Sequence, residues 1–310
     1  MKESSSLIRD GDDEESVESS EKDAITSVIA VSMSLIVIFA SSITIIYLWK
    51  GEDGFVIERP SSALLSWQME YMDLIGANND SLTELNGEGV VVCVVDSGVD
   101  LDHPDLRGVE LRGWRDSING IEEPYDDEGH GTAMTGIIVS DGGLDGVAKG
   151  VDLLVAKAIN DEGQGTDGTV SDSVDWCVQQ GADIISLSLG GSQSFGSDFF
   201  TTDELEQSVD DALDSGVFVV SSAGNDGEDD DGDVGSPGSV EGVICVGGIT
   251  RSGSIWSGSS EGDNDGRLWP NPILPRSDPD KKPEIVGPGH EVPVLMASGV
   301  SNSEWWGWSS

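Results

Sequence analysis

The sequence predicts an α/β fold with a mainly parallel sheet, preceded by one transmembrane helix. Residues Val90 to Val95 favour β-structure without alternating polar positions, which is typical of a strand covered on both faces of a parallel sheet. From there to Gly248, strand-like runs alternate with helical patterns, an order that indicates helices on both faces of the sheet. Upstream, residues Ala24 to Trp49 contain no charged side chain.

The N-terminal part of the chain divides by composition. Residues 1–23 are acidic and rich in serine, and we expect a disordered tail there. At about 1.5 Å per residue, residues 24–49 are long enough to cross a bilayer core of roughly 30 Å, which predicts a transmembrane helix. A cleaved signal peptide is the alternative, although its apolar core usually has only about 7–15 residues. Three cations precede the span while Lys50 and Arg59 follow it, a small bias that favours a cytoplasmic N-terminus.

After the span, residues 50–62 form a predicted linker and residues 63–310 a single domain. Apolar side chains at helical spacing predict a helix over residues 63–75, which ends before Gly76. The other predicted elements are strands at 153–159, 183–189, 217–222 and 242–249 and helices at 170–180 and 202–215. The acidic or proline-rich stretches 227–235 and 258–282 are predicted surface loops.

The charge of the chain limits the classes of function that it can have. Asp and Glu number 59 against 15 Lys and Arg, which gives a formal net charge of -44. Neutralising nucleic-acid phosphates requires clustered cations, so this composition excludes a nucleic-acid binder. The excess of acidic residues indicates either a contribution to solubility alone or adaptation to high salt, where ions screen the repulsion between the acidic side chains.

The cysteines give no sign of a disulfide framework. Cys93, Cys177 and Cys245 lie in or beside apolar runs, and their number is odd and small. We therefore expect three buried thiols that act as small hydrophobic side chains.

Two polar residues mark the candidate chemistry. Asp96 directly follows the strand that begins at Val90, at the carboxyl end where open α/β sheets place ligands and catalytic groups. His130 lies between two glycines in DDEGHGTAMTGII, where the pattern from Thr132 onward predicts the beginning of a helix. Each residue alone has an ordinary explanation as a capping or turn residue. Together they fit a carboxylate that fixes the tautomer of an imidazole and leaves its second nitrogen as a general base.

A third polar residue, Asn225, follows the predicted strand 217–222 in the segment VFVVSSAGNDG. Its amide has glycines on both sides that admit a substrate backbone, so it is suited to stabilising an oxyanion. A simple turn is the alternative explanation, because asparagine and glycine both favour turns.

In combination these segments resemble the subtilisin-like serine proteases, the subtilases of peptidase family S8. VVDSGVDLDHPDL resembles the aspartate motif of the family, DDEGHGTAMTG its histidine motif, and SSAGNDG the segment that carries the oxyanion asparagine. The resemblance covers roughly residues 62–289 and implies a subtilisin-like three-layer fold. It also implies a serine endopeptidase acting on polypeptides, with Asp96 and His130 as catalytic residues and Asn225 in the oxyanion hole. The sedolisin branch is disfavoured because His130 stands where that branch has a glutamate.

The resemblance further implies a substrate cleft. One segment, within DIISLSLGG, corresponds to the strand end that lines the cleft and primary pocket, and another falls where family members pair a substrate strand by β-augmentation. The residues implied in substrate binding are Gly163, Gln164, Gly165, Ser188, Leu189 and Gly190.

The expected nucleophile is missing from this sequence. Family members carry it in a Gly-Thr-Ser motif that opens a buried helix, and no such triplet follows Gly289. Ser309 and Ser310 resemble residues that come just before that motif, so we expect the serine beyond the end of this chain and no activity without it. The alternative is a catalytically inactive, membrane-tethered pseudo-protease or peptide-binding module.

This chemistry requires no cofactor. The resemblance implies calcium as a structural ion with Asp105 at a ligand position, although the short loop 139–144 does not supply the usual partner carbonyls. The acidic loop 226–233 departs from EF-hand spacing and fits a solvated charge run. The expected location is that of a single-pass membrane protein with an extracellular catalytic domain.

Overall fold

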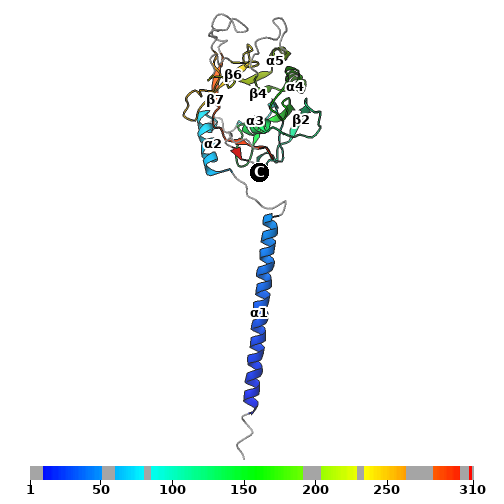
Figure 1. Cartoon of the computed structure of the whole chain (residues 1–310), viewed down its shortest axis with the longest axis vertical. Coiled ribbons are helices and arrows are strands. Elements are labelled where there is room, and N and C mark those ends of the chain that lie inside the picture. Colours follow the sequence, from blue (N-terminus) through cyan, green and yellow to red (C-terminus); the bar gives the residue numbers. More distant parts are fainter. Residues whose placement is uncertain are drawn as a thin grey trace, which may run out of the picture. The chain divides into compact units, whose positions relative to one another are not determined.

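The chain divides into two compact units, residues 1–58 and residues 59–310 (Figure 1). The computed structural model describes residues 10–50, 60–79, 85–190, 204–228, 234–262, 282–300 and 307–308. The linker residues 51–59, the acidic residues 229–233 and the terminal Ser309 and Ser310 lie outside the described residues.

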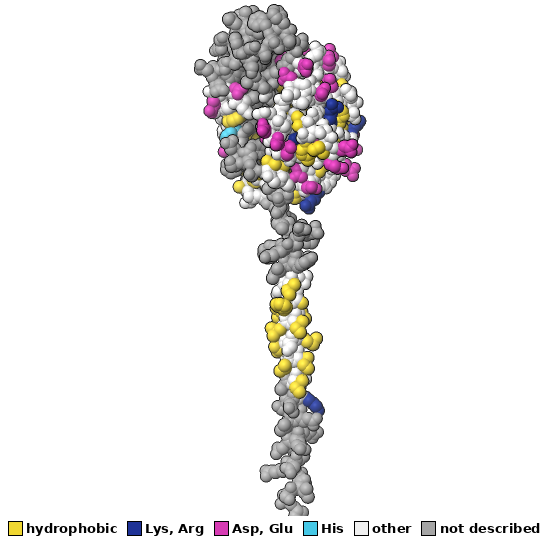
Figure 2. Space-filling view, turned by 45° about the vertical axis from the view of Figure 1, so that its right-hand side comes forward, with side chains coloured by type: hydrophobic (Ala, Val, Ile, Leu, Met, Phe, Trp, Pro, Cys, Tyr) yellow, Lys and Arg dark blue, Asp and Glu magenta, His cyan; other side chains and the backbone are white. Residues whose placement is uncertain are grey.

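The first unit contains one long helix, α1, which spans Asp10–Lys50. Within it, residues 25–45 have a mean hydropathy of 2.4 and are long and apolar enough to cross a membrane, although a signal sequence shares these properties. Their apolar side chains are exposed (Figure 2). Four hydroxyls donate to the carbonyl four residues earlier in the helix: Thr26, Ser34, Ser42 and Thr44. This pairing within the helix satisfies polar groups that an apolar environment would otherwise leave without partners.

Helix α1 begins earlier than its composition predicts. Residues 10–23 are part of α1, so the prediction of a disordered tail over residues 1–23 is wrong for this portion. Extending a helix costs less than nucleating one, and the apolar segment 25–45 supplies a nucleus from which the polar segment continues. Residues 1–9 lie outside the described residues.

The second unit is built around a seven-stranded parallel sheet of order β2-β3-β1-β4-β5-β6-β7. The strands are β1 Val91–Asp96, β2 Leu111–Asp116, β3 Asp152–Lys157, β4 Ile184–Leu187, β5 Phe218–Ser222, β6 Ile244–Ile249 and β7 Ile285–Pro288, with a separate parallel pair β8 Val294–Leu295 and β9 Gly307–Trp308. The helices are α2 Ser62–Leu74, α3 His130–Val139, α4 Asp167–Gln179, α5 Glu204–Asp214 and a short 3-10 helix Pro104–Leu106. The predicted α/β fold with a mainly parallel sheet is confirmed.

Side chains at the helix ends explain where two of these helices begin. The hydroxyl of Ser61 accepts a hydrogen bond from the backbone N–H of Leu64 at the start of α2. At the start of α4, Thr166 and Thr169 exchange hydroxyl and backbone hydrogen bonds in a capping box. Both arrangements satisfy N–H groups that the helix itself leaves without partners.

Four strands, β2, β7, β8 and β9, were not among the elements that the sequence predicts. β2 has the sequence LRGWRD and lies at the edge of the sheet, where its residues are mostly half-buried. Charged side chains are tolerated on such an edge, so no apolar run marks it. β8 and β9 have two residues each and depend on their mutual pairing.

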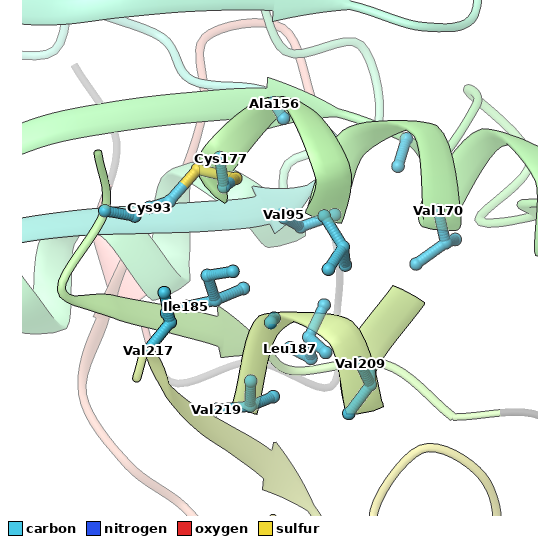
Figure 3. Close-up of a cluster of buried hydrophobic side chains, with 14 of the residues drawn as sticks. Cys93, Val95, Ala156, Val170, Cys177, Ile185, Leu187, Val209, Val217 and Val219 are labelled. Atoms are coloured by element: carbon cyan, nitrogen blue, oxygen red, sulfur yellow. A yellow bond between two sulfur atoms is a disulfide. The ribbon is translucent and has the colours of Figure 1, made fainter. Parts of the chain in front are cut away.

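Two apolar clusters lie on opposite faces of the sheet and give the domain three layers. On one face, α4 and α5 pack against Val95, Ile185 and Val219 (Figure 3). On the other face, α3 packs against β1, and Val94 of β1 and Val155 of β3 are buried there. The predicted three-layer arrangement is therefore confirmed.

The face beneath α3 is covered over only part of the sheet. Strand register places Ile184, Val220 and Val246 on the same face as Val94. These three side chains are only half-buried, whereas Val94 is 1 % exposed. Over β4, β5 and β6, the residues that the structure describes thus leave an apolar sheet face without a covering helix.

A disulfide joins Cys93 of β1 to Cys177 of α4, across 84 residues of sequence (Figure 3). The expectation of three buried thiols is therefore wrong for this pair. Cys245 is buried and outside the disulfide, as expected. Spacing along the chain could not indicate the pairing, because the two sulfurs meet only once α4 has packed on the sheet.

Removing the disulfide should lower the free energy of unfolding by about 2–5 kcal/mol, because the cross-link restricts a long loop in the unfolded chain. The double variant Cys93→Ala/Cys177→Ala tests this in urea unfolding followed by circular dichroism. Cys245→Ala is the matched control and should lose only the smaller amount that comes from its cavity. An equal midpoint for the native protein with and without reductant would contradict the prediction.

Candidate active site

Asp96 is the last residue of β1 and is held in place by its own backbone. Its carbonyl oxygen accepts hydrogen bonds from the N–H groups of Ala158 and Ile159, at 2.8 and 3.2 Å. One carboxylate oxygen accepts the N–H of Ser97 at 2.7 Å. The residue is 2 % exposed, so a carboxylate lies at the carboxyl edge of the sheet with little freedom to move.

His130 is the first residue of α3 and faces Asp96. Its Nδ1 lies 2.8 Å from Oδ1 and 2.9 Å from Oδ2 of Asp96. An ionised carboxylate only accepts hydrogen bonds, so the proton lies on Nδ1 and the lone pair of the neutral ring lies on Nε2. One third of the histidine side chain is exposed, which leaves the ring within reach of a reacting group.

A hydrogen-bond network joins the turn after Asp96 to the first turn of α3. The hydroxyl of Ser97 donates to Asp126 at 2.9 Å and accepts the N–H of Gly131 at 2.8 Å. The second oxygen of Asp126 accepts both the N–H and the hydroxyl of Thr132. A Cβ atom at Gly131 would lie 2.2 Å from the carbonyl oxygen of Gly98, so only glycine allows this close approach.

The surroundings of His130 raise its pKa to about 8. Burial of the ring acts in the opposite direction and lowers the pKa, but the charge and hydrogen bond of Asp96 outweigh it. Glu128 and Asp126 add further negative charge. The site therefore stabilises an imidazolium, which is the form that a general base takes after it has accepted a proton.

Asn225 lies in the loop after β5, two strands away from β1 in the sheet and at the same carboxyl edge. The loop is pinned on both sides of it. The N–H of Ser260 donates to the carbonyl of Gly224 at 3.0 Å, and the N–H of Gly227 donates to Gly258. Asn225 itself is exposed, so its amide is open to solvent at this edge.

The two predicted substrate segments lie on either side of β1. Ser188, Leu189 and Gly190 follow β4, the strand between β1 and β5, and the hydroxyl of Ser222 donates to the carbonyl of Leu189. Residues 163–165 follow β3, the neighbour of β1 on its other side. The topology thus gathers Asp96 and all the predicted cleft segments along one edge of the sheet.

The segment 163–165 is less open to pairing than its glycines suggest. The N–H groups of Gly163 and Gln164 both donate to Asn160, one to its carbonyl and one to its side chain, inside a turn. A substrate strand would therefore find these two donors already engaged. The same turn lies beside the histidine loop, since a Cβ atom at Gly163 would lie 3.8 Å from a carboxylate oxygen of Glu128.

Asp105 faces donors where a calcium ligand would face a cation. Its two carboxylate oxygens accept the N–H groups of Gly143 and Leu144 and the indole N–H of Trp308, at 2.6, 2.8 and 3.1 Å. A cation needs converging oxygen atoms, so these partners do not fit calcium. The described residues contain no group of three or more His, Cys, Asp or Glu side chains suited to a metal.

Sequence reasoning missed two residues that support the Asp96 and His130 pair. Asp126 is the hub of the network around α3, and Lys157 at the end of β3 is fully buried. Lys157 did leave a signal, because it is the only charged side chain in the apolar stretch LLVAKAI. Asp126 left none, since its motif holds three acidic residues among which spacing does not discriminate.

The fold and site together place an aspartate and a histidine in hydrogen-bond contact at the carboxyl edge of a parallel sheet. The model of the subtilase family matches residues 87–307. The chain belongs to the subtilase family.

Several curated relatives are similar to this chain. It is 36 % identical to serine protease AprX of Bacillus subtilis over 225 residues, which cover 69 % of this chain and 49 % of the relative. Identity to the intracellular serine protease of Paenibacillus polymyxa is 36 % over 187 residues, 57 % of this chain and 55 % of that protein. The chain thus spans about half the length of these relatives. A crystal structure of a cold adapted subtilisin-like serine proteinase aligns with a TM-score of 0.54 and 28 % identity, covering 69 % of this chain and 67 % of that one.

Titration of His130 should show a pKa near 8, and Asp96→Asn should lower it, because the substitution removes the charge and the anionic acceptor. The folded pKa lies above the ordinary value of 6.5. The stabilisation from this group is therefore fully present below about pH 6.5 and disappears as the pH rises through about 8. NMR of the histidine Cε1–H resonances measures the titration. Glu110→Gln serves as control, because Glu110 is exposed and this substitution also removes one negative charge. An equal shift of the His130 pKa in both variants would contradict the prediction.

Proposed function

We propose that this chain is the greater part of the catalytic domain of a membrane-anchored serine endopeptidase that hydrolyses polypeptides. The hydrogen bond between His130 Nδ1 and Asp96 is the observation that supports this function most strongly. Asp96 orients His130, and Nε2 of His130 takes the proton from a serine hydroxyl as that oxygen attacks the peptide carbonyl. The imidazolium then returns the proton to the leaving amine.

The serine in this proposal lies beyond residue 310, at the start of a helix. The half-buried face formed by Ile184, Val220 and Val246 supports it, because an apolar sheet face of this kind requires a packed helix. That face is continuous with the part of β1 beneath α3, the helix that carries His130. A helix packed there would run beside α3 and could bring its first residue to the same edge as the imidazole.

Asn225 completes the proposed chemistry as an oxyanion donor. The tetrahedral intermediate places negative charge on the former carbonyl oxygen, and an amide N–H held in place stabilises it. The pinned loop around Asn225 and its exposure at the carboxyl edge support this role. The substrate backbone would lie between residues 163–165 and 188–190.

For location, we propose a single-pass membrane protein with α1 as anchor and the catalytic domain outside the cell. The disulfide between Cys93 and Cys177 supports this orientation independently of the flanking charges, because disulfides persist in oxidising compartments and are rare in the cytosol. A peptide-binding module without catalysis is the alternative function, and it would use the same cleft.

A form of the protein that continues past residue 310 should react with a fluorophosphonate probe and cleave peptides. His130→Ala should abolish labelling and lower kcat by about a millionfold, because the serine then loses its base. Asn225→Ala should cost about 10²–10³ in kcat with little change in KM, the effect of losing one oxyanion donor, for which subtilisin is the reference case. Asn78→Ala, an exposed asparagine on another loop, is the control. Peptide binding without labelling of the longer form would favour the non-catalytic module.

The orientation has its own test in cells. A cysteine-reactive reagent that cannot cross membranes should label a cysteine introduced at exposed Gly181 and spare one introduced at Ser5. Protein extracted under alkaline conditions should remain with the membranes, because α1 is expected to span them. Labelling only at Ser5 would place the domain in the cytoplasm, and release of a shorter chain without residues 25–45 would indicate a cleaved signal.

A further inference from the structure

Lys157 is the last residue of β3 and its side chain is 0 % exposed. In the parallel pairing of β1 with β3, it stands directly beside Asp96. Burying an ammonium group costs several kcal/mol unless its hydrogen bonds are satisfied. An apolar side chain would fill this space without that cost, so we expect the charge to have a role through its contacts. The proposed chemistry has not used this side chain.

The ammonium group donates three hydrogen bonds, which is all that it can donate. Nζ lies 2.6 Å from the carbonyl oxygen of Ser97, 2.8 Å from that of Ile159 and 2.6 Å from Oδ1 of Asp127. Nζ also lies over the ring of Tyr125, 5.0 Å from its centroid. Every hydrogen atom on Nζ therefore points to a segment of the candidate site.

These partners belong to three different segments. Ser97 follows Asp96, and its N–H already donates to the Asp96 carboxylate. Ile159 follows β3 and donates to the backbone oxygen of Asp96. Asp127 belongs to the loop that leads into His130. The one ammonium group of Lys157 thus links the turn that carries the Asp96 carboxylate to the loop that carries the His130 imidazole.

We infer that Lys157 is a positioning residue, which fixes the Asp96 turn and the His130 loop at the separation their hydrogen bond requires. Its relevance to catalysis rests on the proposed function, whereas its effect on the Asp96 and His130 pair does not. A neutral side chain of similar volume would fill the space but would leave two carbonyl groups and one carboxylate without this donor. The two segments would then be joined by the remaining hydrogen bonds between them, which include those of Ser97 with Asp126 and of the Val99 N–H with the carbonyl of Tyr125.

The Lys157→Met variant separates positioning from charge, because the two effects have opposite signs. Removing a nearby positive charge alone would raise the pKa of His130 or leave it unchanged. Loss of positioning lengthens the bond to Asp96 and should lower that pKa from about 8 toward 6.5. NMR titration of His130 in the chain as it stands measures this without a nucleophile. A pKa that rises or stays constant would overturn the inference.

Lys149→Met is the matched control, since Lys149 is a surface lysine paired with Asp141 and Asp145 and carries the same charge. It should leave the His130 titration unchanged. If Lys157→Met does not fold, Lys157→Arg decides, because its planar, longer side chain keeps the charge but cannot direct three donors as Nζ does. The pKa of His130 should then fall by a smaller amount, and an unchanged value in a folded Lys157→Arg protein would contradict the inference.

Discussion

The domain depends on the hydrogen bond between His130 Nδ1 and the Asp96 carboxylate, 2.8 Å long and formed between residues 34 positions apart. An ionised carboxylate at 2 % exposure is costly unless donors surround it, and the imidazole and the Ser97 N–H supply them. The pair that carries the proposed catalysis is therefore also a condition for folding this edge of the sheet. Each partner needs the other to lie where it does.

Much of the nearby structure serves to bring the two segments together. Residue 131 is a glycine, and the absence of a Cβ atom lets α3 begin in close contact with the turn at Gly98. Gly129 adopts φ +102° as the N-cap, a conformation that lets the chain enter the helix immediately before His130. Asp126 and Lys157 also join the two segments, one as an acceptor and one as a donor. Several separate features thus fix the positions of Asp96 and His130, as expected of a preorganised site.

The sequence allowed prediction of features that depend on short-range pattern. The uniformly apolar run ending in Asp96 placed β1 and the carboxylate at its end, and the family motifs identified His130. It did not allow prediction of features that depend on which distant segments meet. The Cys93 and Cys177 disulfide, the edge strand β2 and the donors around Asp105 arise only from tertiary packing. Trp308 illustrates this, because it lies about two hundred residues from the carboxylate it contacts.

Salt affects two electrostatic interactions in this chain differently: the repulsion among surface carboxylates and the attraction between Asp96 and His130. The chain has a formal net charge of -44, and many Asp and Glu side chains among the described residues lie on the domain surface (Figure 2). Repulsion between such charges is screened beyond about 8 Å at physiological ionic strength, and at shorter range as salt rises. The Asp96 and His130 contact is far shorter than this length and is largely removed from solvent, so screening barely weakens it. High salt therefore relieves the repulsion that opposes folding while it leaves intact the attraction that organises the site.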